Sequence, residues 1–527
     1  MTAIPEAADL SPEALIGQLV CVALRNYAGD AAARESFLAD FTRHGWGGVI
    51  VFGGRLEAVR ELLDEARSRS PVSPLVVGDF ERGLGQQFPI DGVVFPPLMA
   101  FGAAGDPTLA REAARAVGGE LRALGFHVNF APVADLAVEP ANPIVATRAA
   151  GADPSRAAAI VAATVEGLQA GGVAATVKHF PGHGRTSLDS HEVLPVVEAT
   201  RADLERADWV PFRAGLEAGA QLVMTAHVAF PALEPDGARD RPATFSRAVA
   251  RDLLRGAWGF EGLVCSDALM MGAVAVEPPD RTARRALEAG VDWLLYPPDP
   301  PLVHAGLVGA LAAGDLDRER CETAAGRLLD LKRWAGVGSD ESPASTSAAP
   351  STSAALLAEA VAGAALTARP AEPPEGRAWP DLAQWVVVLD GAIAPGDIVL
   401  PRELAPAAAE RLLVIDTSDA PDVVRAAVDG ARRRCGGARV ACAVFSPIRA
   451  WKGRAGLSEL GREAVAAACG PAREAVLLIF SNPRIVSEVQ APSRVVWTYG
   501  EDAASQRAAV AFLRGALRAA GRLPIEL

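Results

Sequence analysis

Histidine, tyrosine and cysteine are scarce in this chain, which has 7, 3 and 6 of them among 527 residues. The cysteines show none of the paired spacings typical of metal sites, and several lie in apolar runs: Cys21, Cys265, Cys321, Cys435, Cys442 and Cys469. Scattered cysteines of this kind predict buried thiols in a reducing compartment. Basic residues are fewer than acidic ones, and the formal net charge is −13. This charge argues against a protein that binds the phosphates of nucleic acid.

The sequence contains no uncharged apolar run of about 18 residues, so it predicts no membrane-spanning helix. Residues 1–9 contain neither a basic segment nor an apolar one, and they do not look like a signal peptide. We therefore expect a cytoplasmic protein with no membrane partner. Hydrophobic residues make up 50% of the chain, and its length suggests about two to four domains, or one barrel and a second domain.

Up to about residue 335, short apolar runs alternate with helical stretches rich in Ala, Arg, Glu and Leu. Eight such runs are candidate strands: 19–24, 48–52, 75–79, 128–132, 174–179, 222–227, 263–267 and 293–296. Eight β/α units over about 330 residues predict a (β/α)8 barrel of the TIM type for residues 1–338. A doubly wound sheet is the alternative, but Gly83-Leu84-Gly85 lacks the third glycine of a dinucleotide-binding turn.

The composition changes near residue 335. Residues 339–353 are rich in Ser, Pro, Ala and Thr, which is typical of an exposed linker. After a helical run at 354–368, five further apolar runs are expected to be strands: 385–390, 412–416, 440–445, 476–480 and 495–498. We therefore expect residues 354–527 to form a smaller α/β sandwich domain with a mostly parallel sheet.

Residues 178–191 form a polar loop that holds three of the seven histidines, namely His179, His183 and His191. The loop follows the buried run 173–177, so we expect it at the carboxyl end of a barrel strand, where such barrels build active sites. One interpretation is a structural loop with hydrogen-bonded histidines. A second is a metal site made by the three histidines, although Lys178 would repel the cation. A third is proton transfer by Asp189 and His191, since a carboxylate bonded to an imidazole orients the ring and favours its charged form.

Polar residues recur where the expected strands end or begin: Asp79, Glu81, Asn129, Asp135, Lys178, His179, His227, Asp267 and Asp292. Each alone is more often a helix cap or an ion pair than a catalyst, so the informative feature is their convergence on one barrel face. Among these residues, Asp267 is the clearest candidate for a catalytic role because it follows the buried run 262–265. Its carboxylate would either cap the next helix or act as a nucleophile in glycosyl transfer.

Two motifs resemble one known family. Lys178-His179-Phe180-Pro181-Gly182-His183-Gly184, followed by Asp189-Ser190-His191, closely resembles the signature of β-N-acetylglucosaminidases of glycoside hydrolase family 3. Ser266-Asp267-Ala268-Leu269-Met270-Met271 resembles the nucleophile motif of the same family. The resemblance implies that Asp267 is the nucleophile, that His191 is the acid/base and that Asp189 orients His191. It also implies that Lys178 and His179 bind the sugar, and that no metal or cofactor takes part.

Two further stretches resemble the family. Residues 77–83 resemble a segment whose Asp binds sugar hydroxyls, which implicates Asp79. Relatives often carry an Arg eight residues later, where this chain has Gln87, and the sequence leaves open whether Gln87 contacts the sugar. Residues 142–148 resemble a loop that bears a sugar-binding Arg. The residues beside it differ from the usual ones, but Arg148 keeps its position and is expected to bind the sugar.

The implied activity is that of a retaining exo-β-N-acetylglucosaminidase, which releases GlcNAc from peptidoglycan-derived or related glycosides through a covalent intermediate on Asp267. The expected partner is a small carbohydrate with a terminal β-GlcNAc, with no nucleic acid and no membrane, and the oligomeric state stays open. A phosphorylase with the same residues is one alternative, because a cationic acid would not repel an anionic acceptor. A family 3 β-glucosidase is another, although such relatives usually lack the Asp-x-His pair. The last is a non-catalytic sugar-binding module, which should have lost Asp267 or His191.

Overall fold

The computed structural model describes residues 4–24, 30–338, 351–371, 384–391, 393, 398–403, 411–448 and 453–527. It divides into two compact units. The first comprises Met1–Gly92, Arg111–Asp135 and Val161–Pro350, and the second comprises Val93–Ala110, Leu136–Ile160 and Ser351–Leu527. The second unit thus takes two segments from the region assigned to the barrel domain, and the domain boundaries expected from the sequence stay a prediction.

The first unit is built on an eight-stranded parallel sheet in the order β7-β6-β5-β4-β3-β2-β1-β8. Its strands are β1 (Val20–Leu24), β2 (Gly48–Val51), β3 (Leu75–Gly78), β4 (Val128–Asn129), β5 (Ala174–Phe180), β6 (Leu222–Thr225), β7 (Leu263–Ser266) and β8 (Leu294–Leu295). The two end strands meet through a parallel bridge between Cys265 and Trp293, and Ser266 N donates to Trp293 O at 3.0 Å. The sheet therefore curls into the expected (β/α)8 barrel.

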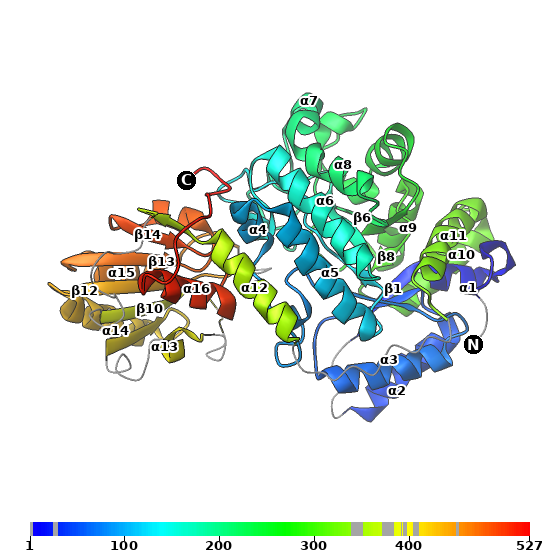
Figure 1. Ribbon diagram of the computed structural model, residues 1–527. Coiled ribbons are helices and arrows are strands. Elements are labelled where there is room, and N and C mark those ends of the chain that lie inside the picture. Colours follow the sequence, from blue (N-terminus) through cyan, green and yellow to red (C-terminus); the bar gives the residue numbers. More distant parts are fainter. Residues whose placement is uncertain are drawn as a thin grey trace. The chain divides into compact units, whose positions relative to one another are not determined.

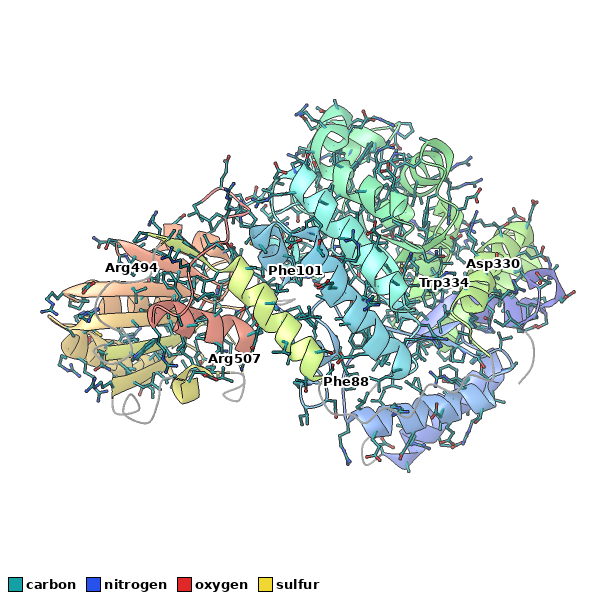
Figure 2. The ribbon with its side chains drawn as sticks, viewed as in Figure 1. Phe88, Phe101, Asp330, Trp334, Arg494 and Arg507 are labelled. Carbon is teal, nitrogen blue, oxygen red and sulfur yellow. The ribbon has the colours of Figure 1, made fainter. Side chains whose placement is uncertain are left out.

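Helices precede, connect and follow the strands of the barrel. They are α1 (Pro12–Gln18), α2 (Ala31–His44), α3 (Leu56–Arg69), α5 (Pro107–Ala123), α6 (Pro154–Ala170), α7 (Arg201–Asp203), α8 (Trp209–Glu217), α9 (Pro279–Ala289), α10 (Pro300–Ala313) and α11 (Arg318–Trp334), with π-helices η4 (Leu204–Asp208) and η7 (Ala248–Ala257). Trp334 ends α11 with 43% of its surface exposed (Figure 2). Among the described residues, no helix has the length and apolar character needed to cross a membrane.

The barrel core forms from the apolar strand residues, because strands of a parallel barrel are buried on both faces. Cys21, Val77 and Phe130 lie in one buried cluster with Leu328 and Leu331 of α11. All six cysteines are free and buried, as the sequence predicted.

Asp292 belongs to the amino-terminal end of the barrel, so the expectation that it would join the polar residues of the active face is wrong. It precedes β8, is fully buried, and receives three guanidinium groups. Arg320 and Arg327 lie 3.0 and 3.1 Å from its Oδ1, and Arg255 binds its Oδ2. The carboxylate therefore ties η7 and α11 to the start of β8.

The second unit contains a six-stranded sheet in the order β11-β10-β12-β13-β14-β9. Its strands are β9 (Thr367–Arg369), β10 (Gln384–Leu389), β11 (Leu412–Asp416), β12 (Arg439–Phe445), β13 (Glu474–Ile479) and β14 (Arg494–Trp497). Among the described strands of this sheet, β9 alone runs antiparallel, against β14, so the sheet is mostly parallel as expected. Its helices are α4 (Leu98–Ala104), α12 (Thr352–Ala365), α13 (Leu400–Glu403), α14 (Pro421–Cys435), α15 (Glu459–Cys469) and α16 (Ala503–Leu513).

The start of this unit differs from the sequence prediction in two ways. Helix α12 begins at Thr352, inside the predicted linker, and Ser351 caps it by accepting from Ala354 N. The rest of that linker, 339–350, lies outside the described residues. The helix also ends at Ala365, and the last residues of the predicted helical run form β9 instead, because Thr367, Ala368 and Arg369 pair with β14. Helix α12 packs against α4 and α16 (Figure 1).

Candidate active site

An ion-paired lysine lies at the carboxyl end of the barrel, where β3 and β5 end. Lys178 is buried, and its Nζ lies 2.7 Å from Asp79 Oδ1 and 2.7 Å from Glu81 Oε1. The Asp79 side chain keeps 30% of its surface exposed. The structure therefore brings together two of the predicted sugar-binding residues, and it adds Glu81, which the sequence placed at this strand end without a role.

The loop that carries Asp79 is held by two amides. Asn129, from β4, accepts a hydrogen bond from Phe80 N at 3.0 Å and donates to Phe80 O at 3.1 Å. Gln87 Nε2 donates to the backbone carbonyl of Asp79 at 2.9 Å. The side chain that replaces the family's usual Arg thus supports the backbone of this loop.

Asp135 organises the first part of the loop after β5. Its Oδ2 binds His179 Nδ1 at 2.7 Å, and its two oxygens accept the backbone N–H groups of His179 and His183 at 3.2 and 2.6 Å. Burial raises the pKa of this carboxyl, but the interactions with His179 and His183 outweigh it, so its pKa is lowered. Because the carboxylate accepts at His179 Nδ1, that ring carries its proton there and directs Nε2 away from Asp135.

His183 serves the loop itself. Its Nε2 lies 2.8 Å from Ser190 Oγ and its Nδ1 lies 2.9 Å from Thr186 Oγ1. Burial lowers its pKa to about 4, so the ring is neutral at neutral pH. Both ring nitrogens are therefore used within the loop, and the part of the chain that the structure describes has no group of three or more His, Cys, Asp or Glu residues arranged to hold a metal ion.

His191 and Asp189 form the predicted pair. Asp189 Oδ1 lies 2.7 Å from His191 Nδ1 and accepts the His191 backbone N–H at 2.8 Å. Asp189 is buried, whereas the His191 side chain is 20% exposed. Since a carboxylate only accepts, Nδ1 carries the proton in this contact, and Nε2 is the ring nitrogen that is not bound to Asp189.

Asp267 follows β7 and is partly buried. Its Oδ1 accepts a hydrogen bond from Ala268 N at 2.7 Å. Burial alone raises the pKa of this carboxyl, but the nearby imidazoles of His179 and His227, the Ala268 N–H and His191 together lower its pKa to about 2. The carboxylate is therefore ionised at neutral pH, as a nucleophile must be.

Backbone hydrogen bonds join the loop of His191 to the loop of Asp267. Gly272 N donates to His191 O at 2.9 Å, and Ala273 N donates to Ser190 O at 3.3 Å. A Cβ at Gly272 would lie 2.4 Å from Glu192 O, so only glycine allows this approach. The backbone of the predicted acid/base and the segment that follows the predicted nucleophile are therefore bound to each other.

His227 is a further residue of the site, whose position at the end of β6 was its only signal in the sequence. It is fully buried, with Nε2 3.1 Å from Ala268 O and Nδ1 2.7 Å from Thr244 Oγ1. Because a carbonyl only accepts, Nε2 carries the proton and Nδ1 accepts from Thr244. Burial is the main cause that lowers the pKa of His227, so the ring stays neutral while it fixes the residue after Asp267.

Arg148 lies in the second unit, whereas the other predicted site residues lie in the first. It ends a short helical turn, η3 (Ala146–Arg148), and its Nη1 donates to Ile144 O at 3.1 Å. Asn142 supports this turn by accepting from Ile144 N and Val145 N at 2.9 and 2.7 Å. The expected sugar contact of Arg148 stays a prediction.

Residues 13–331 match the family model described as the N-terminal domain of glycosyl hydrolase family 3. The chain belongs to this family. It is therefore a glycoside hydrolase, as the motifs after β5 and β7 implied.

Several relatives agree with this assignment. A β-hexosaminidase of Chromobacterium violaceum is 36% identical over 294 residues, which are 53% of this chain and 80% of the relative. A β-N-acetylglucosaminidase/β-glucosidase of Cellulomonas fimi is 32% identical over 340 residues, 63% of this chain and 59% of the relative. A solved family 3 β-N-acetylglucosaminidase from Paenibacillus sp. str. FPU-7 superposes with a TM-score of 0.86 at 29% identity, covering 98% of this chain and 99% of that one.

Proposed function

We propose that this family 3 enzyme is a retaining exo-β-N-acetylglucosaminidase. The observation that carries the proposal is the pairing of His191 with Asp189 on a loop that is hydrogen-bonded to the loop of an ionised Asp267. A proton donor and a carboxylate nucleophile are the two groups that retaining hydrolysis of a glycoside requires. The names of the Chromobacterium and Paenibacillus relatives support N-acetylhexosamine as the sugar.

In the first step, a carboxylate oxygen of Asp267 attacks the anomeric carbon while the glycosidic C–O bond breaks. His191 Nε2 gives its proton to the departing oxygen. Before this transfer His191 is an imidazolium, which Asp189 stabilises through its bond to Nδ1. The glycosyl group is then linked covalently to Asp267.

In the second step, water attacks the anomeric carbon from the side that the leaving group vacated. His191 Nε2 takes a proton from this water, and the bond to Asp267 breaks. The sugar leaves with its original anomeric configuration because two inversions have taken place.

Sugar recognition is assigned to Asp79, Lys178 and His179, all of the first unit. The Lys178 ammonium and the Asp79 carboxylate provide a charged donor and acceptor pair for hydroxyl groups, and hydrogen bonds to charged groups are stronger than neutral ones. We propose peptidoglycan-derived fragments with a terminal β-GlcNAc as natural substrates. The location in the cytoplasm stays a prediction.

The first test is hydrolysis of para-nitrophenyl β-GlcNAc beside the β-glucoside, each with and without phosphate, with the anomer of the product followed by NMR. Preference for GlcNAc, release of the β-anomer and no effect of phosphate are expected. GlcNAc-1-phosphate as product would make the protein a phosphorylase. Faster turnover of the β-glucoside would assign it to the other activity in the name of the Cellulomonas relative, and no turnover of either would contradict the proposal.

A further inference from the structure

An aromatic pair lies at the carboxyl end of the barrel, outside the groups that the proposed mechanism uses. Phe52 follows β2 and Tyr296 follows β8, and their ring centroids are 5.5 Å apart with a tilt of 39°. The two strands are separated in the barrel by β1 alone. The pair therefore spans the end of β1, on the same face of the barrel as Asp79 and Asp267.

Phe52 is unusual for a phenylalanine beside a barrel core, because 46% of its surface is exposed. Tyr296 has a φ of +45°, in the left-handed region that is costly for a side chain of this size, and its backbone N–H is held by Cys21 O at 2.9 Å. Exposed aromatic surface and a strained backbone are both common at ligand sites, because packing alone favours neither.

Contacts on one side connect this pair to the predicted sugar-binding residues. Gly53 follows Phe52, and a Cβ on it would lie 2.8 Å from the carbonyl oxygen of Gln87. Gln87 in turn binds the backbone carbonyl of Asp79. Phe52 therefore adjoins the loop that presents Asp79.

Contacts on the other side connect the pair to the reacting groups. Leu269 N donates to Leu295 O at 2.9 Å, so the segment after Asp267 lies beside the residue that precedes Tyr296. Three residues further on, Gly272 holds the backbone of His191. The leaving group must lie within hydrogen-bond reach of His191 Nε2. The segment after Asp267 contacts both the loop of His191 and the residue before Tyr296, so it connects the aromatic pair to the reacting groups.

We propose that Phe52 and Tyr296 form a platform for the aglycone, with the proposed glycosidase activity as its basis. The ligand chemistry is a flat apolar face, supplied either by an aryl group or by the C–H face of a second pyranose. Such a face would cover the exposed part of Phe52 and gain from contact with both rings.

The test compares kcat/KM on phenyl β-GlcNAc, on a β-GlcNAc-terminated disaccharide and on methyl β-GlcNAc for wild type and Phe52→Ala. We expect a loss of about five- to ten-fold on phenyl and disaccharide substrates, mostly as a higher KM, and little change on the methyl glycoside. A loss on the phenyl glycoside alone would identify an aryl aglycone, and a loss on the disaccharide alone a second sugar. Phe52→Tyr should keep the wild-type pattern, because it retains the ring.

Trp334→Ala is the matched control, since this tryptophan is an aromatic residue of similar exposure, 43%, at the end of α11 (Figure 2). It should leave all three substrates unchanged. Equal losses of Phe52→Ala on all three substrates, or no loss on any, would overturn the platform. If wild type cleaved none of them, the proposed function would fail, and calorimetric binding of phenyl β-GlcNAc to wild type and Phe52→Ala would still decide the platform.

Discussion

The surroundings of Asp267 lower the pKa of its carboxyl group, although burial alone would raise it. Burial favours a neutral carboxyl group, yet the imidazoles of His179, His227 and His191 and one backbone N–H keep it ionised. Its pKa of about 2 lies far below neutral pH, so protonation of Asp267 should not limit activity above about pH 4. Any loss of activity at mildly acidic pH must come from another group.

Replacing Asp267 by Ala should reduce kcat by more than about a thousand-fold, because the reaction loses its proposed nucleophile. Azide should restore part of the turnover of an activated aryl glycoside and give the α-glycosyl azide, since the small anion enters the space that the side chain left. Product analysis by NMR tests this. Asp330→Asn, at an exposed carboxylate of α11 (Figure 2), is the control, and near-wild-type activity of Asp267→Ala would remove Asp267 as the nucleophile.

Replacing His191 by Ala should slow the enzyme according to the leaving group. We expect a loss of about 10²- to 10⁴-fold for alkyl glycosides, which need a proton on the departing oxygen, and a much smaller loss for dinitrophenyl glycosides. Asp189→Asn should give the same trend with smaller losses, because it replaces the carboxylate that accepts at Nδ1 by a neutral amide while His191 stays in place. A uniform loss over a series of aryl leaving groups would show that His191 is not the acid.

Thr244 should act on the chemistry through His227. Its Oγ1 lies 2.7 Å from His227 Nδ1 and 3.0 Å from Thr225 Oγ1. Thr244→Val leaves Nδ1 buried without a donor, at a cost of about 1–3 kcal/mol in stability, and should lower kcat about ten-fold with little change in KM. Thr244→Ser, which keeps the hydroxyl, should behave as wild type. If both variants lost only stability, the network would be structural.

Elements with continuous apolar sequences could be predicted from the chain alone. The eight barrel strands lie where their apolar runs predicted them, because strands buried on both faces need such runs. Strand β9 could not be predicted, since three residues carry no periodic signal and Thr367–Arg369 is defined only by pairing with β14. Likewise the roles of Asp135 and His227 depend on contacts between distant strands, which spacing within one segment does not reveal.

The Asp292 cluster should be essential to the barrel base. Removing a buried carboxylate leaves the guanidinium groups of Arg255, Arg320 and Arg327 without their counter-ion. Asp292→Ala should therefore reduce the free energy of unfolding by about 3–5 kcal/mol in urea denaturation. The control is Asp315→Ala, an exposed partner of Arg284, which should change it by less than about 0.5 kcal/mol. A cost at Asp292 as small as that of the control would contradict the assigned role.

At the scale of the whole molecule, a buried lysine should make the free energy of unfolding depend on pH. Lys332 of α11 is fully buried, its Nζ donates to Gln18 Oε1 at 2.6 Å, and burial lowers its pKa to about 7. The unfolded chain binds a proton at this side chain up to about pH 10, so between about pH 7 and pH 10 it binds more protons than the folded chain does. Stability should therefore rise with pH across this window.

The Lys332→Met variant tests this dependence. At pH 7 the free energy of unfolding of this variant should equal or exceed that of wild type. Above pH 7 the free energy of unfolding of wild type should increase relative to that of the variant by up to about 1.4 kcal/mol per pH unit. Arg333→Met, at the neighbouring position, changes a group that does not titrate in this range, so it should show the wild-type slope. Parallel pH curves for wild type and Lys332→Met would rule out Lys332 as the source.

The backbone bonds from Gly272 and Ala273 to His191 and Ser190 have a consequence for engineering and for descent within the family. The loop after β5 and the loop after β7 are distant in the sequence but hydrogen-bonded to each other. Exchanging either loop alone should therefore break these backbone bonds. A chimaera that imports the β5 loop from a relative should recover activity only when the β7 loop, glycine included, comes from the same parent.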